Sequence, residues 1–325
     1  MEDKGLRAVL LTAIAPVAWG STYVVTRQLL PADAPLWGGV LRALPAGVLL
    51  LVLSRRVPAG AWWWRAPILG VLNVGGFFVL IYVAGQRLPS GLASTLMSTS
   101  AACMMLFAWM LLRRRPRVAT ALGALVGLAG VVVMFGGDPA GFDAWGVAAS
   151  LGAMVASSLG FVLTARWGAD VPALSMASWQ LIAGALVLLP VAVLVEGAPP
   201  ELTAPSALGF AYVTLVATAL AYAVWFSGLR TLSPGVVGVI GLLNPVTGVV
   251  LGVALAGEAF GVAQGIGVAL VLGGVALGAL PPASARRGVS QGEDIFDSRH
   301  GVLRTSVLKC RDEGDRARAG GRGAA

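Results

Sequence analysis

Ten apolar runs of roughly 20 residues, the length that crosses a hydrocarbon core as an α-helix, follow one another along the first 280 residues of the 325-residue chain. The breaks between them carry turn residues, as in Pro31-Ala32-Asp33 and Gly197-Ala198-Pro199-Pro200. We place the runs at about 8–28, 36–53, 66–86, 91–112, 118–136, 143–165, 173–195, 206–229, 234–256 and 261–280. The sequence therefore predicts an all-α polytopic membrane protein with ten transmembrane helices.

The composition supports this class and excludes several others. Hydrophobic residues make up 57% of the chain and charged residues 12%, whereas a soluble domain carries about 25% charged residues. The net charge of +8 comes from short clusters between apolar runs, so we expect membrane lipid, and no nucleic acid, as the surrounding partner. Cys103, Cys310 and the single His300 form no metal-binding or disulfide pattern. No metal or cofactor is expected.

The charges between the runs predict the orientation, because cytoplasmic loops are enriched in Lys and Arg. With the N-terminus inside, only Arg27 and Arg87 lie at the outer ends. The inner segments hold Lys4, Arg7, Arg55, Arg56, Arg65, Arg113, Arg114, Arg115, Arg117, Arg166, Arg230, Arg286 and Arg287. We therefore expect cytoplasmic N- and C-termini, location in the cell inner (plasma) membrane, and a disordered cytoplasmic tail over the polar residues 283–325.

The two halves of the apolar region resemble each other. A shift of 138 positions aligns Tyr23-Val24-Val25-Thr26 with Phe161-Val162-Leu163-Thr164, and Arg42 with Gln180. After the longer connection at 196–205, a shift of 144 continues the match. This pattern predicts a five-helix repeat at 6–136 and a second at 143–280. An odd number of helices per repeat makes the pair inverted, which is the geometry of alternating access; chance similarity among apolar helices is the alternative.

Several short motifs are typical of one family. In order along the chain they are Trp19-Gly20-Ser21, Leu41-Arg42-Ala43, Leu229-Arg230-Thr231-Leu232-Ser233-Pro234-Gly235, Leu243-Asn244-Pro245-Val246 and Gly257-Glu258. Over about residues 6–280 the chain resembles the EamA-type members of the drug/metabolite transporter superfamily. The resemblance implies a secondary transporter of small metabolites. By analogy with the family, we expect it to be an exporter. The chain departs from the family at Arg114, where the first half often repeats the Gly-Glu pair.

Arg42 is the most informative polar residue within a span. An unpaired guanidinium there costs at least ~2.5 kcal/mol on insertion scales. It would anchor a carboxylate or phosphate of the substrate, or it would serve as a structural hydrogen-bond donor that reaches the outer interface; both interpretations stay open. The first favours amino acids or related carboxylates as substrates, with drug-like or secondary-metabolite compounds as the alternative.

The remaining candidate substrate-binding residues are polar or aromatic side chains inside spans. Hydroxyls and amides replace the hydration of a solute and aromatic rings pack on it, but the same groups also hold membrane helices together. Besides Arg42, the candidates are Trp19, Thr22, Asn73, Tyr82, Gln180, Tyr222 and Asn244. Glu258, at the outer end of a span, is expected to cap a helix or anchor a loop. No carboxylate lies deep in a span, so the coupling ion stays open.

Other classes of function compete with transport. An intramembrane protease needs His-Glu-x-x-His, or Gly-x-Ser-Gly with a histidine, and the sole histidine lies in the tail, so no enzyme is expected. A non-transporting membrane assembly protein is a different class, and the polar residues within spans argue against it. The glycine-rich fifth and tenth spans allow either packing on each other, which we expect, or a homodimer surface.

Overall fold

The computed structural model describes residues 2–113, 118–135, 143–168, 170–232, 240–241 and 243–279. Residues 1–280 form one compact unit. The elements in the described ranges are all helical, with no strand among them, which confirms the all-α class. The predicted tail at 283–325, the departure at Arg114 and the Ser233-Pro234-Gly235 part of the family motif lie outside the described residues.

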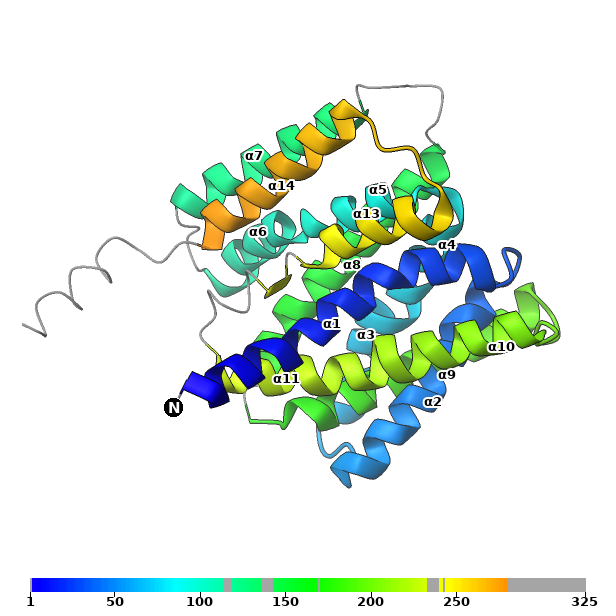
Figure 1. Ribbon diagram of the computed structural model, residues 1–325. Helices are drawn as coiled ribbons and strands as arrows, with labels where there is room; N and C mark the ends of the chain where they lie inside the picture. Colours follow the sequence, from blue (N-terminus) through cyan, green and yellow to red (C-terminus); the bar gives the residue numbers. More distant parts are fainter. Residues whose placement is uncertain are drawn as a thin grey trace, which may run out of the picture. The chain divides into compact units, whose positions relative to one another are not determined.

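The helices follow one another with short connections (Figure 1). The first half contains α1 (Glu2–Leu29), α2 (Pro35–Ser54), α3 (Trp62–Gly70), η1 (Val71–Gly75), α4 (Gly76–Arg87), α5 (Ser90–Ser98), α6 (Ser100–Leu112) and α7 (Val118–Phe135). The second half contains α8 (Ala144–Trp167), α9 (Ala173–Val195), α10 (Ala204–Ala211), η3 (Tyr212–Leu220), α11 (Ala221–Thr231), α13 (Leu243–Ala256) and α14 (Val262–Ala279). The symbol η marks a π-helical segment.

Within the described residues, six helical stretches are long and apolar enough to span a membrane: Leu6–Leu29, Pro35–Ser54, Trp62–Arg87, Ala144–Trp167, Ala173–Val195 and Ala204–Trp225. Four shorter apolar helices lie at Cys103–Leu112, Ala121–Gly130, Leu243–Ala256 and Val262–Gly274. All of these stretches fall on the predicted runs. The protein is therefore a polytopic membrane protein, while the total of ten crossings stays a prediction.

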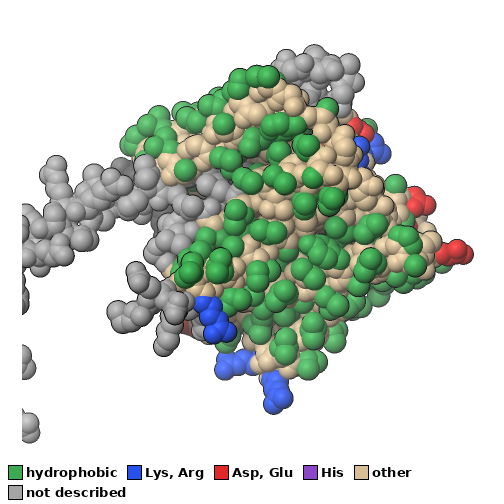
Figure 2. Space-filling view, in the orientation of Figure 1, with side chains coloured by type: hydrophobic (Ala, Val, Ile, Leu, Met, Phe, Trp, Pro, Cys, Tyr) green, Lys and Arg blue, Asp and Glu red, His purple; other side chains and the backbone are tan. Residues whose placement is uncertain are grey.

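The surface of the unit is apolar, as a lipid-embedded helix bundle requires. Large hydrophobic side chains are exposed along most of the helices, for example Val52 at 64%, Leu125 at 63% and Leu194 at 84%. Figure 2 shows these hydrophobic side chains spread over the visible helices, with charged side chains confined to two ends. A soluble protein rarely exposes apolar patches on this scale, so the natural surroundings of this surface are lipid chains.

Helices from the two halves interleave in a regular way. α1 packs against α13 and α11, and α8 packs against α4, α5 and α6. α2 packs on α9, and α7 packs on α14 (Figure 1). The contact between α7 and α14 is close: a Cβ on Gly130 would lie 2.6 Å from the carbonyl oxygen of Gly267. The glycine faces of these two helices are thus used for packing within the chain, as expected.

Three of the predicted spans are not uniform α-helices. The predicted run at 66–86 contains η1 in its middle, and the run at 206–229 contains η3. The run at 91–112, predicted as one helix, breaks at Thr99 into α5 and α6. The Thr99 N–H and hydroxyl both donate to the carbonyl of Leu96, at 3.2 and 2.7 Å. This tight turn uses the groups that would otherwise continue the helix.

Candidate functional site

Arg42 is buried in the contact between the two halves. Its side chain is 8% exposed. The Nε atom donates to Thr218 Oγ1 at 2.9 Å and Nη2 donates to the carbonyl of Ala217 at 3.4 Å. The Cζ atom lies 4.2 Å from the centroid of the Phe78 ring, a cation–π contact. In the described part of the chain Nη1 has no acceptor, so one edge of the guanidinium is not bonded to the described residues.

The partner of Arg42 lies in a π-helical segment. The Thr218 hydroxyl donates to the carbonyl of Val213, five residues earlier, at 2.7 Å. That spacing is the repeat of a π-helix, and such single wide turns are frequent at functional sites. The hydroxyl therefore accepts from Arg42 while donating along its own helix. η3 fixes the hydroxyl that holds the guanidinium.

Asn73 forms a second polar centre in the other π-helical segment, η1. Its Nδ2 donates to Gln180 Oε1 at 2.8 Å and to Thr164 Oγ1 at 3.3 Å. Its Oδ1 is buried without a hydrogen-bond partner in the described residues. Gly160 of α8 faces this amide, and a Cβ at that position would collide with Asn73. The amide therefore joins η1, α8 and α9.

Two small cavities adjoin these polar centres. The first holds about 240 Å³ of atom-free space and the second about 390 Å³, and both are open in part to the surroundings. The first cavity is lined by Thr26, Leu30, Gly38, Arg42, Phe78, Ile81, Tyr82 and Val213. The second is lined by Asn73, Val74, Phe161, Thr164, Met176, Ala177, Gln180, Leu181 and Tyr222. Arg42 and Tyr82 thus share one cavity, and Asn73, Gln180 and Tyr222 share the other.

The linings of the two cavities correspond to each other in sequence. Thr26 and Arg42 of the first cavity lie 138 positions before Thr164 and Gln180 of the second. Phe78 lies 144 positions before Tyr222. These are the two shifts that align the halves. The cavities also lie at corresponding helix ends, the first at the last turn of α1 and the second at the last turn of α8.

The other predicted site residues lie around this centre with different roles. The Trp19 ring lies 6.1 Å from that of Tyr222 and 5.2 Å from that of Trp225, both edge-on. The Thr22 hydroxyl donates to the carbonyl of Ala18 on its own helix at 3.1 Å. Asn244 lies near the start of α13, the helix that packs against α1, and its Oδ1 is buried without a hydrogen-bond partner among the described residues. Neither Thr22 nor Asn244 lines either cavity.

Sequence reasoning missed two residues that complete the centre, Thr218 and Phe78. Single threonines and phenylalanines in apolar helices carry no signal of their own. The repeat, however, contained the information: the shift of 144 pairs Phe78 with Tyr222, and it pairs Asn73 with Ala217, the neighbour of Thr218. Applying the shift to the third span would have identified Phe78, but only the neighbour of Thr218.

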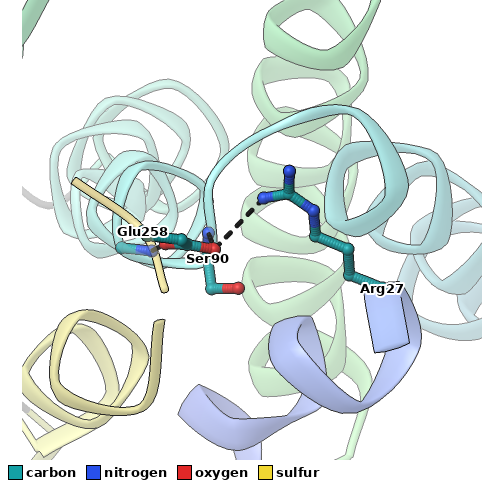
Figure 3. Close-up of polar contacts among 4 residues, drawn as sticks. Arg27, Ser90 and Glu258 are labelled. Carbon is teal, nitrogen blue, oxygen red and sulfur yellow. Dashed lines mark hydrogen bonds and ion pairs between the residues drawn. The ribbon is translucent and has the colours of Figure 1, made fainter. Parts of the chain in front are cut away.

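Glu258 lies apart from the polar centres and caps a helix, as expected. Its carboxylate accepts the N–H groups of Ser90 and Gly91 at the start of α5, at 2.7 and 3.3 Å. It also forms an ion pair with Arg27 Nη1 at 3.2 Å (Figure 3). A carboxylate at a helix N-terminus satisfies donors that have no partner within the helix. Glu258 thus ties the end of α1 to the start of α5.

A second ion pair lies at the same end of the unit. Arg87 Nη1 lies 2.7 Å from Asp143 Oδ2. Asp143 is also the N-cap of α8 and accepts the N–H groups of Trp145 and Gly146. The hydrogen bond from Arg87 lowers the pKa of the Asp143 carboxyl, and the two backbone N–H groups act in the same direction. This contact joins α4 to α8.

Comparison with known proteins relates this chain to a family of transporters. The EamA-like transporter family matches residues 6–136 and again 144–279. Protein PecM of Dickeya dadantii (strain 3937) is 38% identical over 240 residues, which cover 73% of this chain and 80% of PecM. The uncharacterized inner membrane transporter YedA of Escherichia coli (strain K12) is 30% identical over 251 residues, covering 74% of this chain and 80% of YedA.

A solved crystal structure shares the fold, with a TM-score of 0.60 at 23% identity over 86% of this chain and 98% of that one. The helical architecture, the apolar surface and these relatives define a multi-pass transporter of the cell inner membrane. The chain belongs to the EamA-like transporter family, which confirms the resemblance of its motifs.

Proposed function

We propose that this protein is a secondary transporter that exports small carboxylate-bearing metabolites, such as amino acids, by alternating access. The observation that carries the proposal is the Arg42 guanidinium. It is buried, oriented by Thr218 and Phe78, and its Nη1 group has no acceptor in the described residues. A buried guanidinium with a free donor edge suits a carboxylate, because the two planar groups bind through parallel hydrogen bonds.

The cavity beside Arg42 offers both polar and apolar groups to a solute. Thr26 offers a hydroxyl, and Phe78 and Ile81 offer apolar walls. Tyr82 donates its hydroxyl hydrogen to the carbonyl of Pro31 at 2.5 Å, so its ring is fixed at the rim. About 240 Å³ of atom-free space, open in part to the surroundings, lies among these groups.

Alternating access is supported by the correspondence between the halves. Arg42 binds Thr218 across the two halves, and Gln180, its equivalent, accepts from Asn73 across the same boundary. Both partners lie in π-helical segments. In an inverted repeat, exchanging the conformations of the halves closes one cavity while it opens the other. We assign residues 6–136 and 143–280 to the two five-helix repeats.

The charge distribution supports the proposed orientation. Figure 2 shows Lys and Arg side chains at the end of the unit where α1 begins and α2 ends, and Asp and Glu side chains at the opposite end. We call these the basic end and the acidic end. Among the described residues the basic end holds Arg7, Arg55, Arg56, Arg65, Arg113 and Arg166 with the acidic Asp170, and the acidic end holds Asp33, Asp143, Glu196, Glu201 and Glu258 with Arg27 and Arg87. The positive-inside rule then puts the basic end, and both termini, in the cytoplasm.

Counterflow in proteoliposomes tests the substrate class. Vesicles with wild-type protein are loaded with one unlabelled amino acid at a time, and uptake of the same labelled compound is followed. We expect transient accumulation for at least one amino acid, and none for the corresponding amide, which lacks the carboxylate. Accumulation of the amide equal to that of the acid would contradict carboxylate recognition.

One observation favours a second candidate, the export of drug-like or secondary-metabolite compounds. Trp19, Tyr222 and Trp225 form an aromatic cluster next to the second cavity. Such rings pack well on flat apolar molecules. Counterflow of neutral aromatic compounds, with no amino acid transported, would favour this candidate over the first.

A further inference from the structure

One cluster of arginine and tryptophan side chains at the basic end takes no part in the cavities. Arg65 follows Trp62-Trp63-Trp64 at the start of α3, and Trp167 ends α8. The Arg65 Cζ atom lies 5.3 Å from the ring centroid of Trp64, 5.6 Å from that of Trp167 and 6.0 Å from that of Trp62. The rings of Trp64 and Trp167 lie 5.4 Å apart, edge-on. Three aromatic rings thus surround one guanidinium.

The Arg65 guanidinium has no acceptor within the described part of the chain. Its Nε is buried and makes no hydrogen bond there. Both ion pairs of the described residues belong to Arg27 and Arg87, at the acidic end. Asp170, the acidic residue between α8 and α9, is exposed and forms no ion pair with Arg65. A half-buried cation without an acceptor carries a free-energy cost that a bound anion would remove.

On one side of Arg65 the neighbouring side chains are exposed on the apolar surface of the unit. Trp63 is 67% exposed and Trp64 is 51% exposed. One turn further into the span, Ile68 exposes an apolar side chain. Tryptophan is enriched where a bilayer meets water, because its ring is apolar and its N–H is polar. The Arg65 cluster therefore lies at the depth of the lipid headgroups, with an apolar surface below it for acyl chains.

Further positive charge flanks the cluster. The Trp179 ring lies 5.6 Å from that of Trp62, and its Nε1 donates to the carbonyl of Arg56 at 2.8 Å. Arg55 and Arg56 are exposed at the end of α2, and Arg166 is exposed one residue before Trp167. The site is thus a guanidinium held between rings, with three exposed arginines nearby and an exposed apolar surface beside it.

We propose that the Arg65 cluster is a binding site for the phosphodiester headgroup of an anionic phospholipid such as phosphatidylglycerol. Arginine binds phosphate oxygens through two parallel N–H donors, and basic pockets between membrane helices select anionic headgroups. The three tryptophan rings hold the guanidinium so that little freedom is lost on binding. A free phosphate ion would use the charge but not the exposed Trp63, Trp64 and Ile68, which favours the lipid.

Tryptophan quenching by brominated lipid tests the site. The full-length protein is placed in nanodiscs that contain the same small fraction of dibrominated phosphatidylglycerol or dibrominated phosphatidylcholine. Wild type is compared with Arg65→Gln and with Arg65→Lys. Arg113→Gln is the matched control, because Arg113 is an exposed arginine at the same end outside the tryptophan cluster. Circular dichroism and gel filtration verify that each variant is folded.

We expect wild type and Arg113→Gln to favour phosphatidylglycerol about fivefold, Arg65→Lys to favour it less, and Arg65→Gln to show no preference. Equal preference in wild type and Arg65→Gln would overturn the proposal, as would loss of preference in Arg113→Gln, which would indicate bulk charge only. Inorganic phosphate added at constant ionic strength should leave the preference unchanged. Competition by inorganic phosphate would assign the site to a free phosphate group instead, and would overturn the lipid assignment.

Discussion

The Thr218 hydroxyl accepts a hydrogen bond from Arg42 Nε at 2.9 Å and donates one to the carbonyl of Val213. This relationship links a buried cation of the first half to a π-helical turn of the second. The related pair, Asn73 and Gln180, reverses the arrangement: the π-helical residue belongs to the first half and its partner to the second. The two pairs place polar groups at the boundary along which we propose that the halves move.

The hydrogen bond between Arg42 and Thr218 predicts a cost for removing the hydroxyl. In Thr218→Val the Arg42 Nε loses its acceptor inside a buried contact, which should destabilise the protein by about 1–3 kcal/mol. Thermal unfolding in detergent measures the change. Thr95→Val is the control, because Thr95 is also fully buried but its hydroxyl bonds only the carbonyl of Gly91 on its own helix. Equal losses in the two variants would contradict the special role of Thr218.

Gly160 predicts a steric effect on the Asn73 amide. A methyl group in Gly160→Ala would collide with Asn73 and separate Asn73 Nδ2 from Gln180. We expect a lower unfolding temperature and weaker transport, with partial recovery of the unfolding temperature alone when Asn73→Ala is added, because the double variant removes the collision. Gly152→Ala is the control on the same helix, since its Cβ meets only Leu80 Cδ1 at 3.3 Å. Failure of Asn73→Ala to restore stability would show that Gly160 acts through another contact.

Glu258 and Arg27 form an ion pair, but the two partners should not be equally important. Arg27 is 40% exposed, and an exposed pair contributes about 0–1 kcal/mol. Glu258 also caps two N–H groups of α5, and loss of a cap costs about 0.5–2 kcal/mol. Glu258→Ala should therefore lower the unfolding temperature more than Arg27→Gln does. The reverse order, measured under the same conditions, would contradict the capping role.

Asp143 predicts a dependence of stability on pH. Its pKa is lowered in the folded protein, first by the hydrogen bond from Arg87 and then by two backbone N–H groups. A carboxyl with a lowered folded-state pKa stabilises the protein above its unfolded-state pKa, and this contribution is lost as the pH falls through the folded-state value. Wild type should unfold at a higher temperature than Asp143→Asn at neutral pH, and the two should converge in acid. A constant difference at all pH values would contradict this account.

Much of the fold follows from the sequence because an apolar run of this length can satisfy its backbone hydrogen bonds inside a bilayer by forming an α-helix. The ends of α9 at residues 173 and 195 match the predicted run, since Pro172 and Gly197 mark them. The π-helical segments and the break at Thr99 were not predictable from apolar length. They depend on single hydroxyl and amide groups whose partners, such as Arg42 for Thr218, lie more than a hundred residues away.

The candidate site was predictable in part for the same reason. Arg42, Asn73 and Gln180 stand out as polar residues in apolar runs, and the structure places all three at the boundary between the halves. Phe78 does not stand out, because a phenylalanine in an apolar run is indistinguishable from a packing residue until its ring is found 4.2 Å from the guanidinium. Which of these groups touches substrate stays a prediction.

The most direct test of the central claim is counterflow of a transported amino acid by Arg42→Gln beside wild type in proteoliposomes. Arg27→Gln is the control, because it removes an arginine that lies outside both cavities. If Arg42 binds the substrate carboxylate, flux persists in wild type and Arg27→Gln and falls at least tenfold in Arg42→Gln, consistent with the loss of about 1.5–3 kcal/mol for a hydrogen bond to a charged group. Equal flux in wild type and in folded Arg42→Gln would contradict the claim and leave Arg42 with a structural role alone.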